Sequence, residues 1–450
     1  MNENNLKSIS PIDGRYRKIS KKISSYFSEY ALIKYRVYVE IEYFKALCDI
    51  PLKQLASISS SDKKKISAIA SKFSLENANR IKKIEQKINH DVKAVEYFIK
   101  EEFDDLGLKN YKEFIHFGLT SQDINNTATP LMLKFCLKNI LLPSLGDVLK
   151  LLKNKSDDFI NISMIARTHG QAASPTTFGK EINVFYERIK NQLNLLYKIP
   201  NNGKFGGASG NLNAHYVSYP SIDWDNFSNK FLERLGLERS KPTTQIEHYD
   251  NMAAIFHNLS RINTILIDFC KDIWHYISIN YLIQKVNKKE IGSSAMPHKI
   301  NPIDFENAEG NLMLANSLYT FFSEKLPISR LQRDLTDSTI SRNIGLPLAY
   351  SKIAFDSIIK GINKLDIGKE TIEKDLNNNW AVVSEAIQTI LRREKISNPY
   401  ELLKDLTRSN DKITKESISK FINDLPINQK IKDELSKIAP KNYIGNSNKK

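Results

Sequence analysis

Seven short segments of this 450-residue chain hold polar residues whose types and spacing could carry chemistry. They are residues 10–16, 89–91, 120–126, 167–171, 243–247, 292–302 and 330–342. Arg333 and Arg342 stand beside Ser, Thr and Asp in a chain with few arginines. They are therefore better candidates for an anion site than any lysine, although a surface ion pair is the default interpretation of either alone.

The segment 292–302, GSSAMPHKINP, has the most unusual composition. Two serines follow a glycine, and two prolines bracket Lys299 and Asn301. The segment joins two long helical patterns, and a purely structural linker would not need a lysine and an asparagine between prolines. This composition is typical of a loop that closes over an anionic substrate.

Three other segments also have simple structural interpretations. Thr120-x-x-Asp123 has the pattern of a helix N-cap with an acid in the first turn. His90, between Asn89 and Asp91, could be a buried histidine with satisfied neighbours or a functional group. The glycine-rich stretch 203–210 lacks the spacing of a phosphate-binding loop and follows no strand, so we interpret it as a mobile loop.

These segments must be positioned by helices, because apolar residues repeat at spacings of three and four along most of the chain. The clearest pattern covers residues 251–290, and others run over 133–152, 178–196 and 305–322. Pro143 is expected to kink the second of these, and Pro327 to end the last. No period-two alternation bounded by hairpin turns is found.

The sequence therefore predicts an all-α fold with a central bundle of long helices. We expect an N-terminal helical domain over 1–112, a central domain over 113–364 and a C-terminal helical domain over 365–450. The tail GNSNKK is expected to fray. Because the 251–290 pattern is apolar on more than one side, with Phe256, Ile265 and Trp274 widening it, we expect bundle formation between subunits and hence a homo-oligomer.

Composition excludes several classes of protein. The chain has no apolar run long enough for a membrane span and no apolar secretory signal, so a cytoplasmic location is expected. Three distant cysteines, Cys48, Cys136 and Cys270, exclude a disulfide framework and are interpreted as core thiols. The eight histidines form no metal-binding motif, and no cofactor is expected.

The net charge of +15 could suggest nucleic-acid binding, but the pattern of the charges does not support it. Lysines number 51 against 15 arginines, and they are scattered without interleaved aromatic residues. Lys, Ile and Asn are all abundant and all have AT-rich codons, so genome composition explains the excess. We expect no nucleic-acid partner and no membrane partner.

Taken together, the motifs resemble the fumarase/aspartase superfamily, and within it the bacterial long-chain adenylosuccinate lyases. GSSAMPHKINP is similar to the superfamily signature loop. SPIDGRY, NHDVKAVEYF, TSQDINN, RTHGQ, TTQIE and QRDLTDSTISRN stand in the order that the family shows. The resemblance implies a three-domain all-α subunit in a homotetramer with active sites shared between subunits. It also implies β-elimination of fumarate from adenylosuccinate, giving AMP, and from SAICAR, giving AICAR.

The resemblance also implies roles for individual residues. Ser293 would be the general base, with Lys299 and backbone N–H groups stabilising its alkoxide, and His169 the general acid. His90 would support the substrate or the acid. The residues expected to hold the dicarboxylate part are Thr120, Ser121, Thr168, Gln245, Lys299 and Asn301. Those expected to meet the nucleotide phosphate are Arg15, Tyr16, Arg333, Ser338 and Arg342. Asn89, Asp91 and Thr339 complete the expected substrate-binding set.

One departure and three alternatives remain open. After TTQIE the chain reads His248-Tyr249-Asp250-Asn251, where the relatives have Pro-His-Asp-Tyr, so no role is assigned to His248. A sister lyase such as an argininosuccinate lyase would lack the phosphate site. A non-catalytic structural protein would not need Ser293 and His169, and a nucleic-acid binder would show salt-dependent DNA retention.

Overall fold

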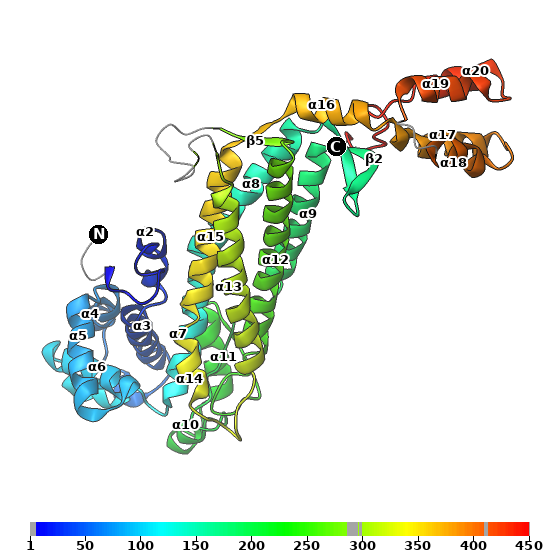
Figure 1. Cartoon of the computed structure of the whole chain (residues 1–450). Helices are drawn as coiled ribbons and strands as arrows, with labels where there is room; N and C mark the ends of the chain where they lie inside the picture. The colour runs from blue at the N-terminus through cyan, green and yellow to red at the C-terminus, as the bar shows by residue number, and fades with distance from the viewer. Residues whose placement is uncertain (1–5, 286–295, 297–298, 409–412, 450) are drawn as a thin grey trace. The chain divides into compact units, whose positions relative to one another are not determined.

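The computed structural model describes residues 6–285, 296, 299–408 and 413–449, and the chain is mostly helical (Figure 1). This confirms the predicted fold class. The chain divides into two compact units, each built from three separate stretches. Unit 1 consists of Met1–Leu145, Gln192–Thr264 and Gly310–Asp356, and unit 2 of Gly146–Asn191, Ile265–Glu309 and Ser357–Lys450. The division into three domains stays a prediction.

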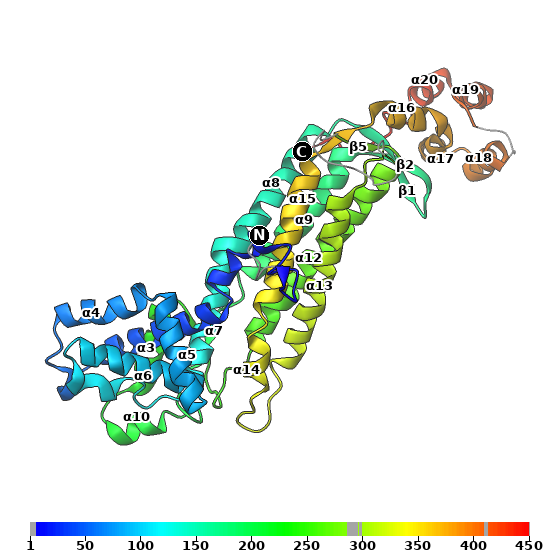
Figure 2. The same cartoon turned by 60° about the vertical axis from the view of Figure 1, so that its left-hand side comes forward.

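In unit 1, helices α4 to α7 pack around the buried helix α3 (Figure 2). Serines start three of the helices by accepting backbone N–H groups: Ser28 before α3, Ser59 before α4 and Ser74 before α5. The helices of this unit are α2 (Arg17–Ser20), α3 (Glu29–Leu47), α4 (Ser60–Ser71), α5 (Leu75–Ile88), α6 (Asp91–Asp105), α7 (Ser121–Cys136), α10 (Asn213–Ser218), α11 (Trp224–Arg234) and α14 (Thr336–Ser341). Its strands β3 (Asn202–Gly203) and β4 (Glu238–Arg239) pair in parallel.

Five other helices contribute residues to both units: α8 (Leu142–Asp158), α9 (Phe178–Leu196), α12 (Asp250–Ser278), α13 (Ile303–Lys325) and α15 (Gly345–Asn363). Within unit 1, Phe256 of α12 stacks on Tyr319 of α13, with ring centroids 5.6 Å apart. Within unit 2, the rings of Phe269 of α12 and Phe185 of α9 pack edge to face, with centroids 5.4 Å apart. The predicted helices over 178–196 and 305–322 are confirmed as α9 and α13.

Unit 2 also holds two antiparallel strand pairs and the C-terminal helices. Strands β1 (Ser163–Thr168) and β2 (Gln171–Thr177) form a hairpin, and β5 (Leu282–Gln284) pairs with β6 (Leu365–Ile367). The remaining helices are α16 (Lys369–Asn378), α17 (Ser384–Arg393), α18 (Pro399–Arg408), α19 (Lys415–Asp424) and α20 (Gln429–Ser436).

The structure corrects four local predictions. The helix predicted over 251–290 ends at Ser278, because Asn280 adopts a left-handed backbone (φ 58°) and the chain enters β5. The β1–β2 hairpin was not expected. The tail does not fray around Ser447, whose carbonyl accepts from the Thr177 hydroxyl at 3.0 Å in a buried position. The stretch 203–210, interpreted as a mobile loop, is anchored by buried polar contacts.

Other expectations hold locally. A π-helical turn (Leu137–Leu141) separates α7 from α8 just before Pro143, so the helical pattern is interrupted where a kink was predicted. Cys136 and Cys270 are buried and Cys48 is partly buried, and burial raises the pKa of the Cys48 thiol to about 11. No helix in the described part of the chain is long and apolar enough to cross a membrane.

Candidate active site

Residues 89–91 form the junction between α5 and α6. Asn89 ends α5 in a left-handed conformation (φ 52°), and the exposed His90 caps α6, its Nδ1 accepting the backbone N–H of Lys93 at 3.1 Å. The interpretation of His90 as a buried histidine is therefore wrong. Because Nδ1 accepts this hydrogen bond, it carries no proton itself. In the neutral ring the proton is therefore on Nε2.

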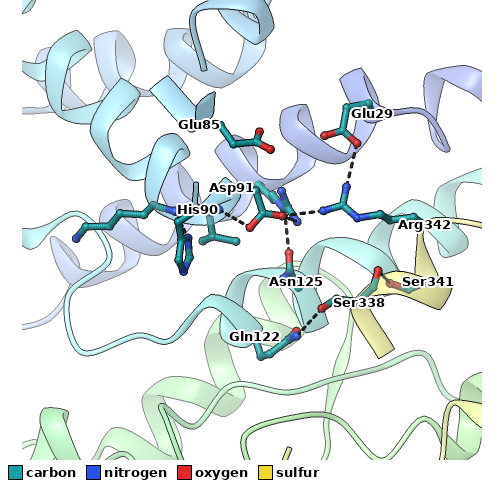
Figure 3. Close-up of polar contacts among 12 residues, drawn as sticks. Glu29, Glu85, His90, Asp91, Gln122, Asn125, Ser338, Ser341 and Arg342 are labelled. Carbon is teal, nitrogen blue, oxygen red and sulfur yellow. Dashed lines mark hydrogen bonds and ion pairs between the residues drawn. The ribbon is translucent and has the colours of Figure 1, made fainter. Parts of the chain in front are cut away.

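Asp91 is the centre of an ion-pair cluster in unit 1 (Figure 3). Its Oδ2 accepts from Arg36 at 2.7 Å and from Arg342 at 2.8 Å, while its Oδ1 accepts the Val92 N–H at 2.8 Å. Burial alone would raise the pKa of the Asp91 carboxyl, but the two guanidinium groups hold that pKa below its usual range. The carboxylate therefore stays ionised at neutral pH.

The two arginines of this cluster differ in burial. Arg36 is 3% exposed and also donates to Asn125 at 2.9 Å, and its burial lowers the pKa of its guanidinium. Arg342 is exposed and lies between Asp91 and Glu29, and it donates to the Glu29 carboxylate at 2.9 Å (Figure 3). Arg36 is thus the buried partner of Asp91, and Arg342 is the exposed partner, which solvent or a ligand can reach.

A second cluster in unit 1 joins three of the predicted binding residues. Arg333 donates to the Gln245 side-chain oxygen at 3.0 Å and to the Ser338 hydroxyl at 3.3 Å. Gln122 donates to the same hydroxyl at 3.1 Å (Figure 3). A small cavity of about 20 Å³ beside Gln122 and Ser338 has room for about one water molecule.

Thr120 is the N-cap of α7 and Ser121 is its first residue, and both are partly buried. The Thr120 N–H donates to the Asp123 carboxylate at 2.9 Å, which confirms the predicted helix cap. Thr339 lies next to Ser338 on the short helix α14. At the start of unit 1, the Arg15 guanidinium lies 5.9 Å from the centre of the Tyr16 ring.

Unit 2 carries the remaining predicted residues. Thr168 ends β1, and His169 and Gly170 form a two-residue hairpin turn in which both residues have positive φ, 52° and 76°. This is the type I′ turn that matches strand twist, so it presents the His169 ring at the exposed tip of a hairpin. Lys299 is exposed and Asn301 partly buried, while Ser293 lies outside the described residues.

The described residues supply many hydrogen-bond donors suited to an anionic ligand, and the exposed His169 imidazole could transfer a proton. No group of His, Cys, Asp and Glu in the described ranges could hold a metal ion. Hydroxyl, amide and guanidinium groups dominate the unit 1 clusters. Such groups can bind carboxylate or phosphate oxygens directly.

Comparison with known proteins agrees with this chemistry. A family model described as "Lyase" matches residues 14–316, and one described as "Adenylosuccinate lyase C-terminal" matches residues 329–444. Adenylosuccinate lyase of Dictyostelium discoideum is 56% identical over 98% of this chain and 97% of its own. The chain belongs to the adenylosuccinate lyase family.

Other members and solved structures extend the comparison. Adenylosuccinate lyase of Escherichia coli K12 is 44% identical over 99% of this chain and 98% of its own length. A fumarate lyase from Mesorhizobium sp. BNC1 has a TM-score of 0.75 at 18% identity, covering 95% of this chain and 96% of that one. This second likeness concerns the fold, which is that of the fumarase/aspartase superfamily.

Four polar residues of the unit 1 clusters were not predicted from the sequence, namely Glu29, Arg36, Gln122 and Asn125. Gln122 and Asn125 lie inside the quoted TSQDINN motif, so helical periodicity could have placed them. Arg36 gave only a weak signal, a single cation in the middle of an apolar helix. A buried arginine requires a partner, and that requirement could have suggested a search for an acid.

A pH-sensitive contact precedes the TSQDINN motif of this family member. His116 Nδ1 contacts Glu40 at 2.5 Å, and although burial lowers the pKa of His116, Glu40 outweighs it and raises that pKa above its usual range. A group with a raised folded pKa stabilises the fold fully below its unfolded pKa, about 6.5. That stabilisation is then lost as pH rises through the folded pKa.

We therefore expect His116→Asn to lower the melting temperature most at about pH 6 and less at about pH 9. Asparagine tolerates the positive φ of this position (60°), so the substitution tests the ion pair rather than the backbone. Thermal unfolding of both proteins across this range measures the difference. A difference that stays constant with pH would exclude the ion pair as its source.

Proposed function

We propose that this chain catalyses β-elimination of fumarate from adenylosuccinate, giving AMP, and from SAICAR, giving AICAR, in purine nucleotide biosynthesis. The observation that carries this proposal is identity of 44–56% to adenylosuccinate lyases over nearly the full length of both chains. The clusters of amide, hydroxyl and guanidinium donors in unit 1 support it, because both substrates carry carboxylates and a phosphate.

In this mechanism a base removes the proton next to a substrate carboxylate, and an acid protonates the departing nitrogen. Ser293 is the proposed base, with Lys299 and backbone N–H groups stabilising its alkoxide. His169 is the proposed acid, since an imidazole can donate a proton near neutral pH. Donors around the carboxylate stabilise the charge that builds there as the C–H bond breaks.

The proposed binding residues form groups according to the part of the substrate that they would hold. Thr120, Ser121, Thr168, Gln245, Lys299 and Asn301 would hold the dicarboxylate part. Arg15, Tyr16, Arg333, Ser338 and Arg342 would hold the phosphate, and Asn89, His90, Asp91 and Thr339 would complete the site. Arg342 already donates to Asp91 and Glu29, but a guanidinium has five N–H donors, so it can also donate to a bound phosphate.

The test is an ultraviolet assay of the purified protein with adenylosuccinate, with argininosuccinate in a parallel cuvette and fumarate quantified in both. Fumarate from adenylosuccinate alone is the expected result. Fumarate from argininosuccinate alone would keep the chemistry but overturn the proposed phosphate site. No fumarate from either substrate would reject the proposed activity.

We also propose a homotetramer in which each active site takes residues from three subunits. Several apolar side chains on the long helices are exposed in the single chain: Trp274 of α12 is 41% exposed, and Met313, Leu314 and Phe321 of α13 are 57%, 52% and 47% exposed. Burying them between subunits would remove them from water. Sedimentation should give a tetramer at assay concentrations, and a stable monomer would contradict this proposal.

A further inference from the structure

The glycine-rich stretch that follows β3 encloses a fully buried ion pair. Lys204 Nζ lies 2.7 Å from Asp123 Oδ1, and both side chains are 0% exposed. Lys204 also donates to the Gly207 carbonyl at 2.5 Å. Burial lowers the pKa of the Lys204 ammonium, and Asp123 offsets part of that shift.

Asp123 joins this stretch to the first turn of α7. Its carboxylate accepts the backbone N–H groups of Gly206 at 2.9 Å and of Gly207 at 3.1 Å, in addition to that of Thr120. The loop amides therefore form an anion-binding nest, and its anion is a side chain of the chain itself. The carboxylate fixes the loop and the Thr120–Ser121 turn in one arrangement.

The same loop orients Gln245. The Gln245 amide nitrogen donates to the Ala208 carbonyl at 2.9 Å, so its oxygen is the atom that faces Arg333. The contact is close, because a Cβ at Gly210, which has φ +88°, would lie 2.0 Å from the Thr243 carbonyl oxygen. Only glycine lets the loop approach the segment that carries Gln245.

A buried ion pair is a poor source of stability, since its desolvation cost can exceed the attraction between the charges. Its best-attested benefit is to select one arrangement over others. Here the pair joins two segments that both carry proposed substrate-binding residues. A positioning role therefore accounts for the pair better than a contribution to stability.

We propose that Lys204 and Asp123 are positioning residues that hold Thr120, Ser121 and Gln245 in the geometry that binds the substrate carboxylates. This inference rests on the proposed function and assigns a role to two residues that do not touch substrate. Lys204 acts through Asp123 and the Gly207 carbonyl, and Asp123 acts through the backbone N–H groups of Gly206, Gly207 and Thr120.

The test uses the full-length enzyme and the variants Lys204→Met, Gln245→Ala and their combination, with kcat, KM and melting temperature measured for each. We expect Lys204→Met to raise KM for adenylosuccinate at least about tenfold, with a smaller change in kcat. If Lys204 acts through Gln245, the two effects on KM combine to less than their product. If the effects of the two substitutions on KM instead multiply, Lys204 does not act through Gln245 and the positioning role is overturned.

Lys204→Met alone leaves a buried carboxylate unpaired, so the double variant Lys204→Met/Asp123→Asn is made as well. With both charges removed, its melting temperature should return toward the parent value while KM stays raised. A double variant with the KM of the parent would overturn the positioning role. Failure of both variants to fold would show that the fold itself needs the pair, which also overturns it.

Two controls distinguish a positioning role from general destabilisation and from a missing activity. Leu55→Ala, a core substitution in unit 1 outside the site, should lower the melting temperature and leave KM unchanged. If it raised KM as much as Lys204→Met does, general destabilisation would account for both. A parent enzyme without activity on adenylosuccinate would reject the proposed function, whereas an active parent with unaffected variants would reject only the positioning role.

Discussion

Replacing His169 by Asn is expected to lower kcat for adenylosuccinate by about 10²- to 10⁴-fold, the range over which general acid catalysis contributes. The ring sits exposed at the tip of the β1–β2 hairpin, and asparagine tolerates the positive φ of that turn. The melting temperature should therefore change little. The measurement is initial-rate kinetics alongside thermal unfolding of the same preparations.

His248→Asn is the matched control, because His248 is also exposed and its Nε2–H donates to the Pro242 carbonyl at 2.8 Å. Its kcat should stay within a few-fold of the parent. Ser293→Ala should be as damaging as His169→Asn if Ser293 is the base, and Ser294→Ala much less so. Turnover within a few-fold of the parent in both His169→Asn and Ser293→Ala would refute the mechanism.

Asp91→Asn is expected to destabilise the protein by about 3 kcal/mol, because it leaves the buried Arg36 guanidinium without a carboxylate. The amide keeps the shape of the side chain but cannot balance two arginines. It also releases one of the two carboxylates that hold Arg342. Denaturant unfolding should show the loss as a lower midpoint, and KM for adenylosuccinate should change with it.

Asp49→Asn provides the comparison for that substitution. Asp49 also accepts from two cations, Lys63 at 2.6 Å and Arg234 at 2.9 Å, but its side chain is 48% exposed. Solvent screens such pairs, so the expected loss is below about 1 kcal/mol. Equal losses in the two variants would mean that the burial of Arg36 does not determine the energy of the Asp91 cluster.

Sequence patterns predicted the long helices because their apolar stripes are continuous. Helices α9 and α13 begin and end within a few residues of the predicted patterns. The β1–β2 hairpin escaped prediction because its strands, SMIART and QAASPTT, contain small residues without polar alternation. Its turn, His169-Gly170, is a weaker signal than the Asn-Gly pair that marks most such turns.

Sequence motifs predicted several residues of the candidate site but not the contacts between them. Arg333, Ser338 and Gln245 were named from motifs, and the structure brings them together within unit 1. The buried partners could not be read from spacing: Arg36 is 55 residues from Asp91, and Lys204 is 81 from Asp123. Contacts at such separations depend on tertiary packing, which local patterns do not encode.

The interleaving of the two units constrains how this protein can be made in a cell. Unit 1 needs residues up to Asp356, and unit 2 starts at Gly146, so synthesis of each unit overlaps synthesis of the other. The ribosome delivers residues in order, and domains generally fold as units once they are complete. Arg36 and Asp91 therefore emerge from the ribosome long before Arg342. A nascent chain released before unit 1 is complete would expose apolar helices that chaperones must cover.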